Sequence, residues 1–463
     1  MENADTNENT QRSLSWTAGL SAALGVPLLI IPSIEYFAKY LGGISVALWI
    51  ISIAQGFIQN LAYGEMAVNY PKVNGLPGCA QEILGKTDKT AYRFLGGFCA
   101  WGYWFAWAPI PSIFSISITE FLLSVLPIKL PVPKTVLNIF IGSVILWQMF
   151  FSNRRGLQHN AVKGYILNFI SIVPLIIIAA LPFAEGKADL SRVFGDRGHM
   201  LFSLKPVEIL LTFGLFAMAQ WSACAWETAA IYAPEYKNPA KDTMKALVSC
   251  GLICLAVFVL IQASCISTFG ASGSAHAEKP ILLMLAEAGL GEKSVLPMAA
   301  IIIAAMLSII QTGFSGASRA IYSMAKEGNF PAVFKKLNRC NMPQNAMLLI
   351  VLLNYALIIT GSSSALVAAS SVGYCLANGI CLFAYTIYKS GSKKRENTRF
   401  SLPYVWMFFA AALAVLNLVC YIAGLIYLNM LDYGMISISI CMIVILSYFP
   451  IYFFVAIKGK EKR

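Results

Sequence analysis

Residues 22–32 read Ala-Ala-Leu-Gly-Val-Pro-Leu-Leu-Ile-Ile-Pro and lie inside an apolar segment of roughly residues 15–41. A segment of this length and polarity is typical of a helix that crosses a membrane. Pro27 has no N–H and its ring clashes with the preceding turn, while Gly25 permits unusual backbone angles. The stretch therefore predicts either a proline kink or a helix that breaks near the middle of the bilayer.

A second apolar segment, residues 206–232, carries an unusual mixture of side chains. Its residues 216–227 read Phe-Ala-Met-Ala-Gln-Trp-Ser-Ala-Cys-Ala-Trp-Glu. At the centre of a bilayer Glu227 would cost about 2.5–3.5 kcal/mol on insertion scales. We therefore expect Glu227 to face an aqueous cavity or a polar partner on a neighbouring helix, and we expect a second helix break here.

The chain as a whole is too apolar for a water-soluble protein. Of its 463 residues 58% are hydrophobic and 12% are charged, whereas soluble proteins have about 45–50% and about 25%. A soluble enzyme, a disordered chain and a nucleic-acid-binding protein are thereby disfavoured. Lipid offers the backbone no hydrogen-bond partners, so each apolar segment should be a helix. The expected spans are 15–41, 43–69, 92–126, 135–152, 161–183, 206–232, 243–269, 295–326, 344–361, 364–388, 402–428 and 433–456.

The net charge of +12 has a topological explanation. With both termini inside, 25 of the 34 Lys and Arg residues fall on the cytoplasmic side of these spans. Positive residues accumulate there because they resist translocation. We therefore expect a multi-pass protein of a prokaryotic plasma membrane, with cytoplasmic tails at 1–14 and 457–463 and no nucleic-acid partner.

The cysteine and histidine residues suggest packing rather than chemistry. The 11 Cys form no C-x-x-C pair, and the three His are far apart in the sequence. We expect neither a disulfide framework nor a metal site, and no cofactor. The thiols should pack between helices.

The two expected breaks fall in the first and sixth spans, five spans apart. That spacing is what two inverted five-helix repeats produce. We therefore expect a first repeat over 15–183 (helices 1–5) and a second over 206–388 (helices 6–10). Two further helices over 402–456 would lie outside the repeats.

Three motifs then resemble a known family of transporters. Residues 63–67 (Tyr-Gly-Glu-Met-Ala) are similar to its "Y-x-E-L-A", residues 226–239 to its "G-x-E…E-x-K-N-P", and residues 318–346 to its "S-R…A-x-D-G-x-x-P…P-x-x-A". The chain thus resembles the amino acid–polyamine–organocation transporters. The resemblance implies an all-α membrane protein of about 12 helices, with the leucine-transporter fold of 5 + 5 inverted repeats.

Within that family, the pocket segments look most like those of the arginine–agmatine exchangers. Tyr103, Trp104 and Trp107 match an aromatic pattern of span 3, and residues 221–227 match "W-A-F-x-G-x-E". The resemblance implies that Trp221 stacks on the cationic part of the substrate; ordinary helix packing is the alternative. It also implies these roles: substrate binding by Ala23, Gly25, Val26, Tyr103, Trp107, Trp221, Ser222, Cys224 and Ala225; proton coupling or gating by Glu227 and Trp226; and a helix break at Gly25 and Pro27.

Three departures from the family pattern affect the expected ligands. The "G-S-G" of span 1 reads Gly25-Val26-Pro27, so one N–H that could hold a carboxylate is missing. Ala225 replaces a glycine, and Ser171 stands where some proton-coupled members have a lysine. A proton is the expected coupling ion, and sodium stays open.

The sequence therefore predicts a secondary transporter for an amino acid or a related small organic amine, linked to protons or working by exchange. An organic cation such as ethanolamine, choline or a polyamine is the alternative substrate. An ion channel and a transporter-like sensor are alternatives of another class. The expected partners are the small-molecule substrate and the lipid bilayer, with a homodimer left open.

Overall fold

The computed structural model describes residues 14–70, 75–86, 90–125, 132–155, 172–195, 205–276, 295–391 and 398–460. This part of the chain is helical and contains no β-strand; Leu14 and Tyr236 form an isolated bridge. Within these described ranges, nine helices are long and apolar enough to cross a membrane, and two apolar helices are shorter, Ile172–Ala184 and Gln344–Ile358. With the interrupted segment 16–41 they account for every predicted span, and residues 161–171 of the fifth lie outside the described residues.

The secondary-structure elements divide, in chain order, into those of the first half of the chain and those of the second half. Those of the first half are α1 (Trp16–Ala23), η1 (Val26–Ser33), α2 (Ile34–Leu41), α3 (Ser45–Asn69), α4 (Gly75–Gly85), α5 (Thr90–Trp107), α6 (Ile110–Val125), α7 (Lys134–Asn153) and α9 (Ser191–Gly195). Those of the second half are α10 (Pro206–Cys224), η2 (Ala225–Glu235), α11 (Pro239–His276), α13 (Val295–Lys326), η4 (Ala332–Lys335), α14 (Gln344–Ile358), α15 (Ser363–Ser390), α16 (Trp406–Val415), η6 (Leu416–Tyr421), α17 (Ile422–Leu446) and α18 (Tyr448–Lys460).

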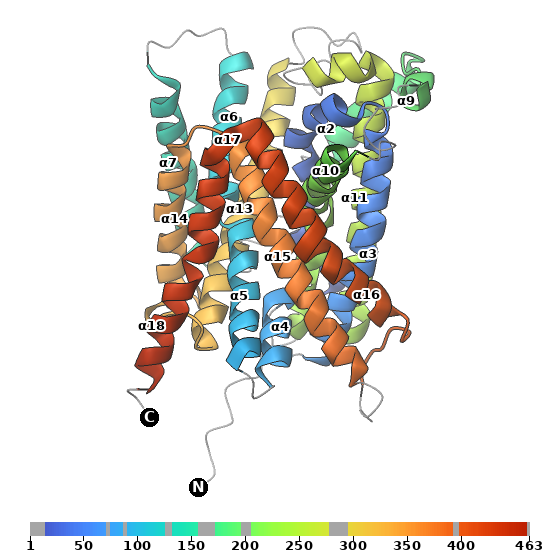
Figure 1. Cartoon of the computed structure of the whole chain (residues 1–463). Coiled ribbons are helices and arrows are strands. Elements are labelled where there is room, and N and C mark those ends of the chain that lie inside the picture. The colour runs from blue at the N-terminus through green and yellow to red at the C-terminus, as the bar shows by residue number, and fades with distance from the viewer. Residues whose placement is uncertain are drawn as a thin grey trace.

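The long helices run side by side in one bundle (Figure 1). The short helix α4 and the end of α18 lie at one end of the bundle, and α9 lies at the other. Large apolar side chains such as Phe140 and Ile443 point outward, while polar side chains such as Gln220 and Asn354 are buried. This distribution fits a protein whose outer surface contacts lipid, and the all-α membrane fold is confirmed.

Two pairs of glycines bring helix backbones into direct contact. A Cβ on Gly102 of α5 would lie 2.9 Å from the carbonyl oxygen of Gly373 in α15. A Cβ on Gly424 of α17 would clash with the backbone nitrogen of Gly214 in α10. Small residues permit such close approach between membrane helices. These contacts fix the position of α15 along α5 and the position of α17 along α10.

Two features differ from the segments read from hydropathy. The third span divides into α5 and α6 at a turn over Ala108 and Pro109, because proline lacks the N–H that a continuous helix needs. The buried helix α4 lies between the second and third expected spans, where hydropathy predicts no helix. It is too short for a span and contains glycine and proline.

Candidate functional site

The sixth span changes from α-helix to 3₁₀-helix at the end of α10. The last residue of α10 is Cys224, and η2 starts at Ala225. Asn60 of α3 donates from Nδ2 to the carbonyl oxygen of Cys224 at 2.8 Å. The Cys224 thiol donates to the carbonyl oxygen of Ser52, also on α3, at 3.0 Å. The Asn60 side chain therefore satisfies a backbone carbonyl where the α-helical ladder stops, and the Cys224 thiol links this point to α3.

The first span is interrupted in the same manner. Helix α1 ends at Ala23, and the 3₁₀-helix η1 runs from Val26 to Ser33 with Gly25 before it. Pro27 stands in the first turn of η1, where a missing N–H is tolerated. A Cβ on Gly25 would lie 3.0 Å from Oγ1 of Thr312 in α13, so glycine permits a close helix contact at the interruption.

The two interrupted spans contact each other on both sides of their breaks. The hydroxyl oxygens of Ser33 and Ser222 are 3.4 Å apart. Farther along, Leu14 donates its N–H to the carbonyl oxygen of Glu235 at 3.1 Å, and Lys237 donates to that of Leu14 at 2.9 Å. The sequence prediction placed both breaks in separate spans, and the structure brings these spans together.

Glu227 lies in η2 and is buried, with 1% of its surface exposed. The Tyr374 hydroxyl of α15 donates to Glu227 Oε2 at 3.0 Å. The Tyr103 side chain of α5 faces the same carboxyl group. Oε1 of Glu227 has no hydrogen-bond partner among the described residues. A buried acceptor without a partner is costly, so this atom is suited to receive a proton or a cationic ligand.

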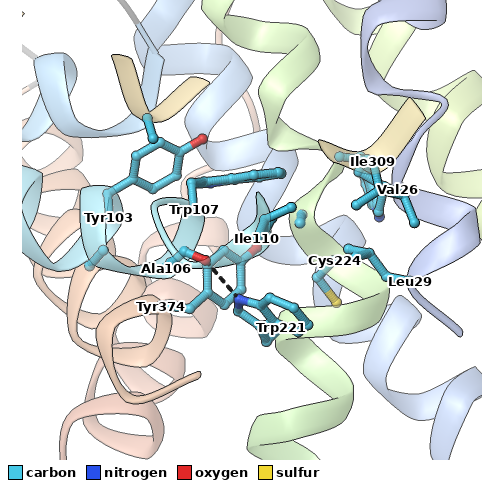
Figure 2. Packing of buried hydrophobic residues seen from close by; sticks show 14 of the residues in the cluster. Val26, Leu29, Tyr103, Ala106, Trp107, Ile110, Trp221, Cys224, Ile309 and Tyr374 are labelled. Atoms are coloured by element: carbon cyan, nitrogen blue, oxygen red, sulfur yellow. Dashed lines mark hydrogen bonds between the residues drawn. The ribbon is translucent and has the colours of Figure 1, made fainter. Parts of the chain in front are cut away.

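An aromatic group lies beside the end of α10 (Figure 2). Trp221 donates its indole N–H to the carbonyl oxygen of Ala106, in the last turn of α5, at 3.2 Å. Tyr103 and Trp107 are one turn apart on α5, with ring centroids 6.2 Å apart. In the view of Figure 2, Val26 and Leu29 of η1 lie to the right of Cys224, and Tyr103 and Trp107 of α5 lie to its left. The structure thus gathers residues of η1, α5 and α10 that the sequence assigned to one pocket.

Three other predicted residues have local roles. Trp226 packs its ring against Phe57 of α3 with centroids 5.1 Å apart. The carbonyl oxygen of Ala225 accepts from the Thr228 hydroxyl at 3.2 Å. The Trp226 ring is thus held by packing against α3, whereas Glu227 beside it faces α5 and α15. Ala23 ends α1, and its carbonyl oxygen faces the Cys250 thiol at 3.7 Å.

Sequence reasoning missed Tyr374 and the residues next to it. Asn378, one turn farther along α15, accepts a hydrogen bond from the Tyr63 hydroxyl of α3 at 2.8 Å. Tyr63 is noted only as part of a motif, and the predicted site includes no residue of the span at 364–388. A signal was available, because Tyr374 and Asn378 are polar groups one turn apart inside an apolar span.

Metal ligands are not gathered in the described part of the chain. No group of three or more His, Cys, Asp or Glu side chains there could hold a metal ion. The 11 cysteines are free thiols, and all except Cys340 and Cys420 are buried. The candidate site therefore consists of one carboxyl group, aromatic rings and the backbone at two helix interruptions.

These features define a class, a multi-pass α-helical membrane protein with two interrupted spans in contact with each other and a buried carboxyl group in one of them. Residues 14–454 match the model of the amino acid permease family, and the chain belongs to that family. The family makes the chain a permease of the amino acid–polyamine–organocation superfamily rather than an enzyme.

Individual relatives are distant. The chain is 25% identical to the amino-acid permease RocC of Bacillus subtilis over 66% of its own length and 63% of that protein. It is 24% identical to the lysine-specific permease LysP of Lactococcus lactis, over 74% of the chain and 68% of the relative. It is 21% identical to an arginine/ornithine antiporter of Pseudomonas aeruginosa, over 55% and 52%. The chain thus spans less than two thirds of RocC and of the antiporter.

Proposed function

We propose that the protein moves an amino acid or a related small organic amine across the plasma membrane by alternating access. The observation that carries this proposal is the unpartnered Oε1 of Glu227 at a helix interruption, close to a second interrupted helix. Such interruptions expose backbone dipoles to a ligand. Relatives whose names specify lysine, arginine and ornithine support a substrate with an amino group.

The proposed binding mode divides the ligand between two partners. The cationic group lies near Trp221, where a desolvated cation–π contact is worth about 2 kcal/mol. A carboxylate, if the ligand has one, lies on backbone N–H groups at the start of η1, after Gly25. Pro27 supplies no N–H there, which favours amines without a carboxylate as the second candidate class. Ethanolamine, choline and polyamines belong to that class.

Proton coupling is assigned to Glu227. A cation that arrives at Oε1 compensates the negative charge of the carboxylate, so binding and proton release are linked through one group. Tyr374 holds the other carboxyl oxygen and fixes its orientation.

The proposed architecture contains two inverted repeats, residues 15–183 and 206–388, and residues 402–456 are additional. Both termini are proposed to be cytoplasmic. Ser171, which bears on the coupling ion, lies outside the described residues.

A thermal-shift screen followed by uptake tests this proposal. The purified protein is heated with L-lysine, L-arginine, L-ornithine, γ-aminobutyrate, ethanolamine, choline and putrescine. A ligand at 100 times its Kd should stabilise the protein by about 2.7 kcal/mol. Uptake of each compound into proteoliposomes is then measured with a proton gradient, a sodium gradient or internal substrate. If no compound stabilises the protein or enters the liposomes, the proposal fails.

A further inference from the structure

The eleventh span contains a π-helical turn that lies outside the proposed repeats. It is η6, Leu416–Tyr421, between α16 and α17. Asn417 donates from Nδ2 to the carbonyl oxygen of Leu413, four residues earlier, at 2.8 Å. This side chain therefore takes a place in the backbone ladder. Short π-helical turns re-aim side chains and occur often at functional sites.

Both polar side chains of this turn point into the protein. Asn417 and Tyr421 are buried, with 0% and 3% of their surfaces exposed. Gln220 of α10 donates from Nε2 to Oδ1 of Asn417 at 2.9 Å and to Oε1 of Gln59 at 3.0 Å. The Tyr421 hydroxyl donates to Oε1 of Gln55 at 2.7 Å. The turn thus joins the eleventh span to α10 and to α3.

The backbones support the same connection. Gly214 and Gly424 bring α10 and α17 into contact, and a Cβ on Gly214 would lie 2.6 Å from the carbonyl oxygen of Gly424. Gln220 lies less than two turns beyond Gly214 on α10. The rotation of α10 about its axis is therefore constrained by a backbone contact at one height and by the Asn417 hydrogen bond at the next.

Packing alone does not explain the amide groups. Oε1 of Gln220, Nε2 of Gln59 and Nε2 of Gln55 are buried and have no partner among the described residues. Apolar side chains of similar volume would avoid that cost, because a partly satisfied buried polar network is less stable than an apolar one. What the network does provide is a set of directional hydrogen bonds that hold Gln220 between Asn417 and Gln59.

Gln220 directly precedes Trp221 in the last turn of α10. Neighbouring helical residues are fixed relative to each other by the backbone, so a hydrogen bond that holds Gln220 also sets the direction in which Trp221 leaves the helix. We propose that Asn417, aimed inward by the π-helical turn, is a positioning residue that orients Trp221 for the substrate. This inference depends on the proposed function only through the role of Trp221 as a ligand contact.

The test uses the full protein labelled with 5-fluorotryptophan and observed by fluorine NMR. The resonance of Trp221 is assigned with Trp221→Phe. Asn417→Leu is compared with Asn429→Leu, because Asn429 is also buried in the eleventh span and also donates to the carbonyl oxygen four residues earlier, at 2.7 Å. The Oδ1 atom of Asn429 accepts from Ser437 rather than from α10. Asn417→Ala is the second variant if Asn417→Leu does not fold.

The expected result is a shifted or broadened Trp221 resonance in the Asn417 variant and an unchanged one in Asn429→Leu. Uptake of L-arginine should then show a KM raised about fivefold, the factor of one lost hydrogen bond, with kcat unchanged. An unchanged Trp221 resonance in the folded Asn417 variant, or equal changes in both variants, overturns the proposal. If the wild type does not take up L-arginine, the NMR comparison alone decides, so failure of the proposed function is seen separately.

Discussion

Glu65 and Lys389 form a fully buried ion pair, with Lys389 Nζ 2.6 Å from Glu65 Oε1 and with 2% and 0% of the lysine and glutamate side chains exposed. Glu65 Oε2 also accepts from the Tyr385 hydroxyl at 2.6 Å. Lys389 donates a second hydrogen bond to the carbonyl oxygen of Leu402 at 2.6 Å. The pair therefore fastens α3, α15 and the segment before α16 to one another.

Removal of one charge of this pair should destabilise the protein strongly. In Glu65→Gln the Lys389 ammonium stays buried without a counter-charge, and such a loss costs about 3–5 kcal/mol. The double variant Glu65→Gln/Lys389→Gln should lose less than the sum of the single variants, because neither charge remains. The free energy of unfolding, measured by denaturant titration in mixed micelles, checks this.

Lys134 and Glu120 provide the matched control, since their atoms are 2.7 Å apart but their side chains are 51% and 40% exposed. Lys134→Gln should change stability by less than about 1 kcal/mol. Equal losses at the buried and the exposed pair would contradict the role given to Glu65 and Lys389.

Gly56 of α3 should not tolerate a side chain, because it packs against the end of α10, where the sixth span is interrupted. A Cβ at this position would lie 2.8 Å from the Cys224 sulfur, which sits at the end of α10. Gly56→Ala should therefore lower stability by about 1–3 kcal/mol. Adding Cys224→Ala should recover part of that loss, since the sulfur is removed.

Gly316 is the control, because it is also inside a helix and a Cβ there would meet no atom within 4 Å. Gly316→Ala should be neutral or stabilising by about 0.5–1 kcal/mol. The melting temperatures of the four proteins decide. A Gly56→Ala melting temperature equal to that of the wild type would show that α3 and Cys224 are not in close contact.

Glu227→Gln should flatten the pH dependence of uptake. The amide can still accept the Tyr374 hydrogen bond that Oε2 accepts at 3.0 Å, but it cannot release a proton. Uptake of the compound with the largest thermal shift is measured from pH 5 to pH 8 in proteoliposomes. Tyr374→Phe keeps the carboxyl group and should retain a pH dependence, with altered rates. A full wild-type profile in Glu227→Gln would remove Glu227 from proton coupling.

The positions of the helices along the chain could be predicted from the sequence, because they depend on local composition. Apolar length sets each span, and Gly25 with Pro27 marks a place where a regular helix is disfavoured. The mixed polar and aromatic residues 216–227 indicate the second interruption. These signals lie within single segments, and the cost of a carboxyl group inside an apolar span indicated Glu227. Trp221 was assigned to the candidate site by the family resemblance.

The pairings between segments could not be predicted. Tyr374 and Glu227 are 147 residues apart in sequence, and Lys389 and Glu65 are 324 apart. Hydropathy indicates that a helix is buried. It does not determine the rotation of the helix about its axis, which decides which side chains face each other. Asn417 illustrates this limit, since a π-helical turn changes the direction of side chains without a distinctive local composition.

In the proposed function, Trp221 and its neighbours bind a cationic substrate between the two interrupted spans. The most direct test compares Trp221→Leu with Trp147→Leu in proteoliposome uptake of the best thermal-shift ligand; Trp147 is 38% exposed on α7 and serves as the control. Loss of a contact worth about 2 kcal/mol should raise KM roughly 30-fold in Trp221→Leu and leave Trp147→Leu unchanged. An unchanged KM in a folded Trp221→Leu protein would show that Trp221 does not bind the substrate.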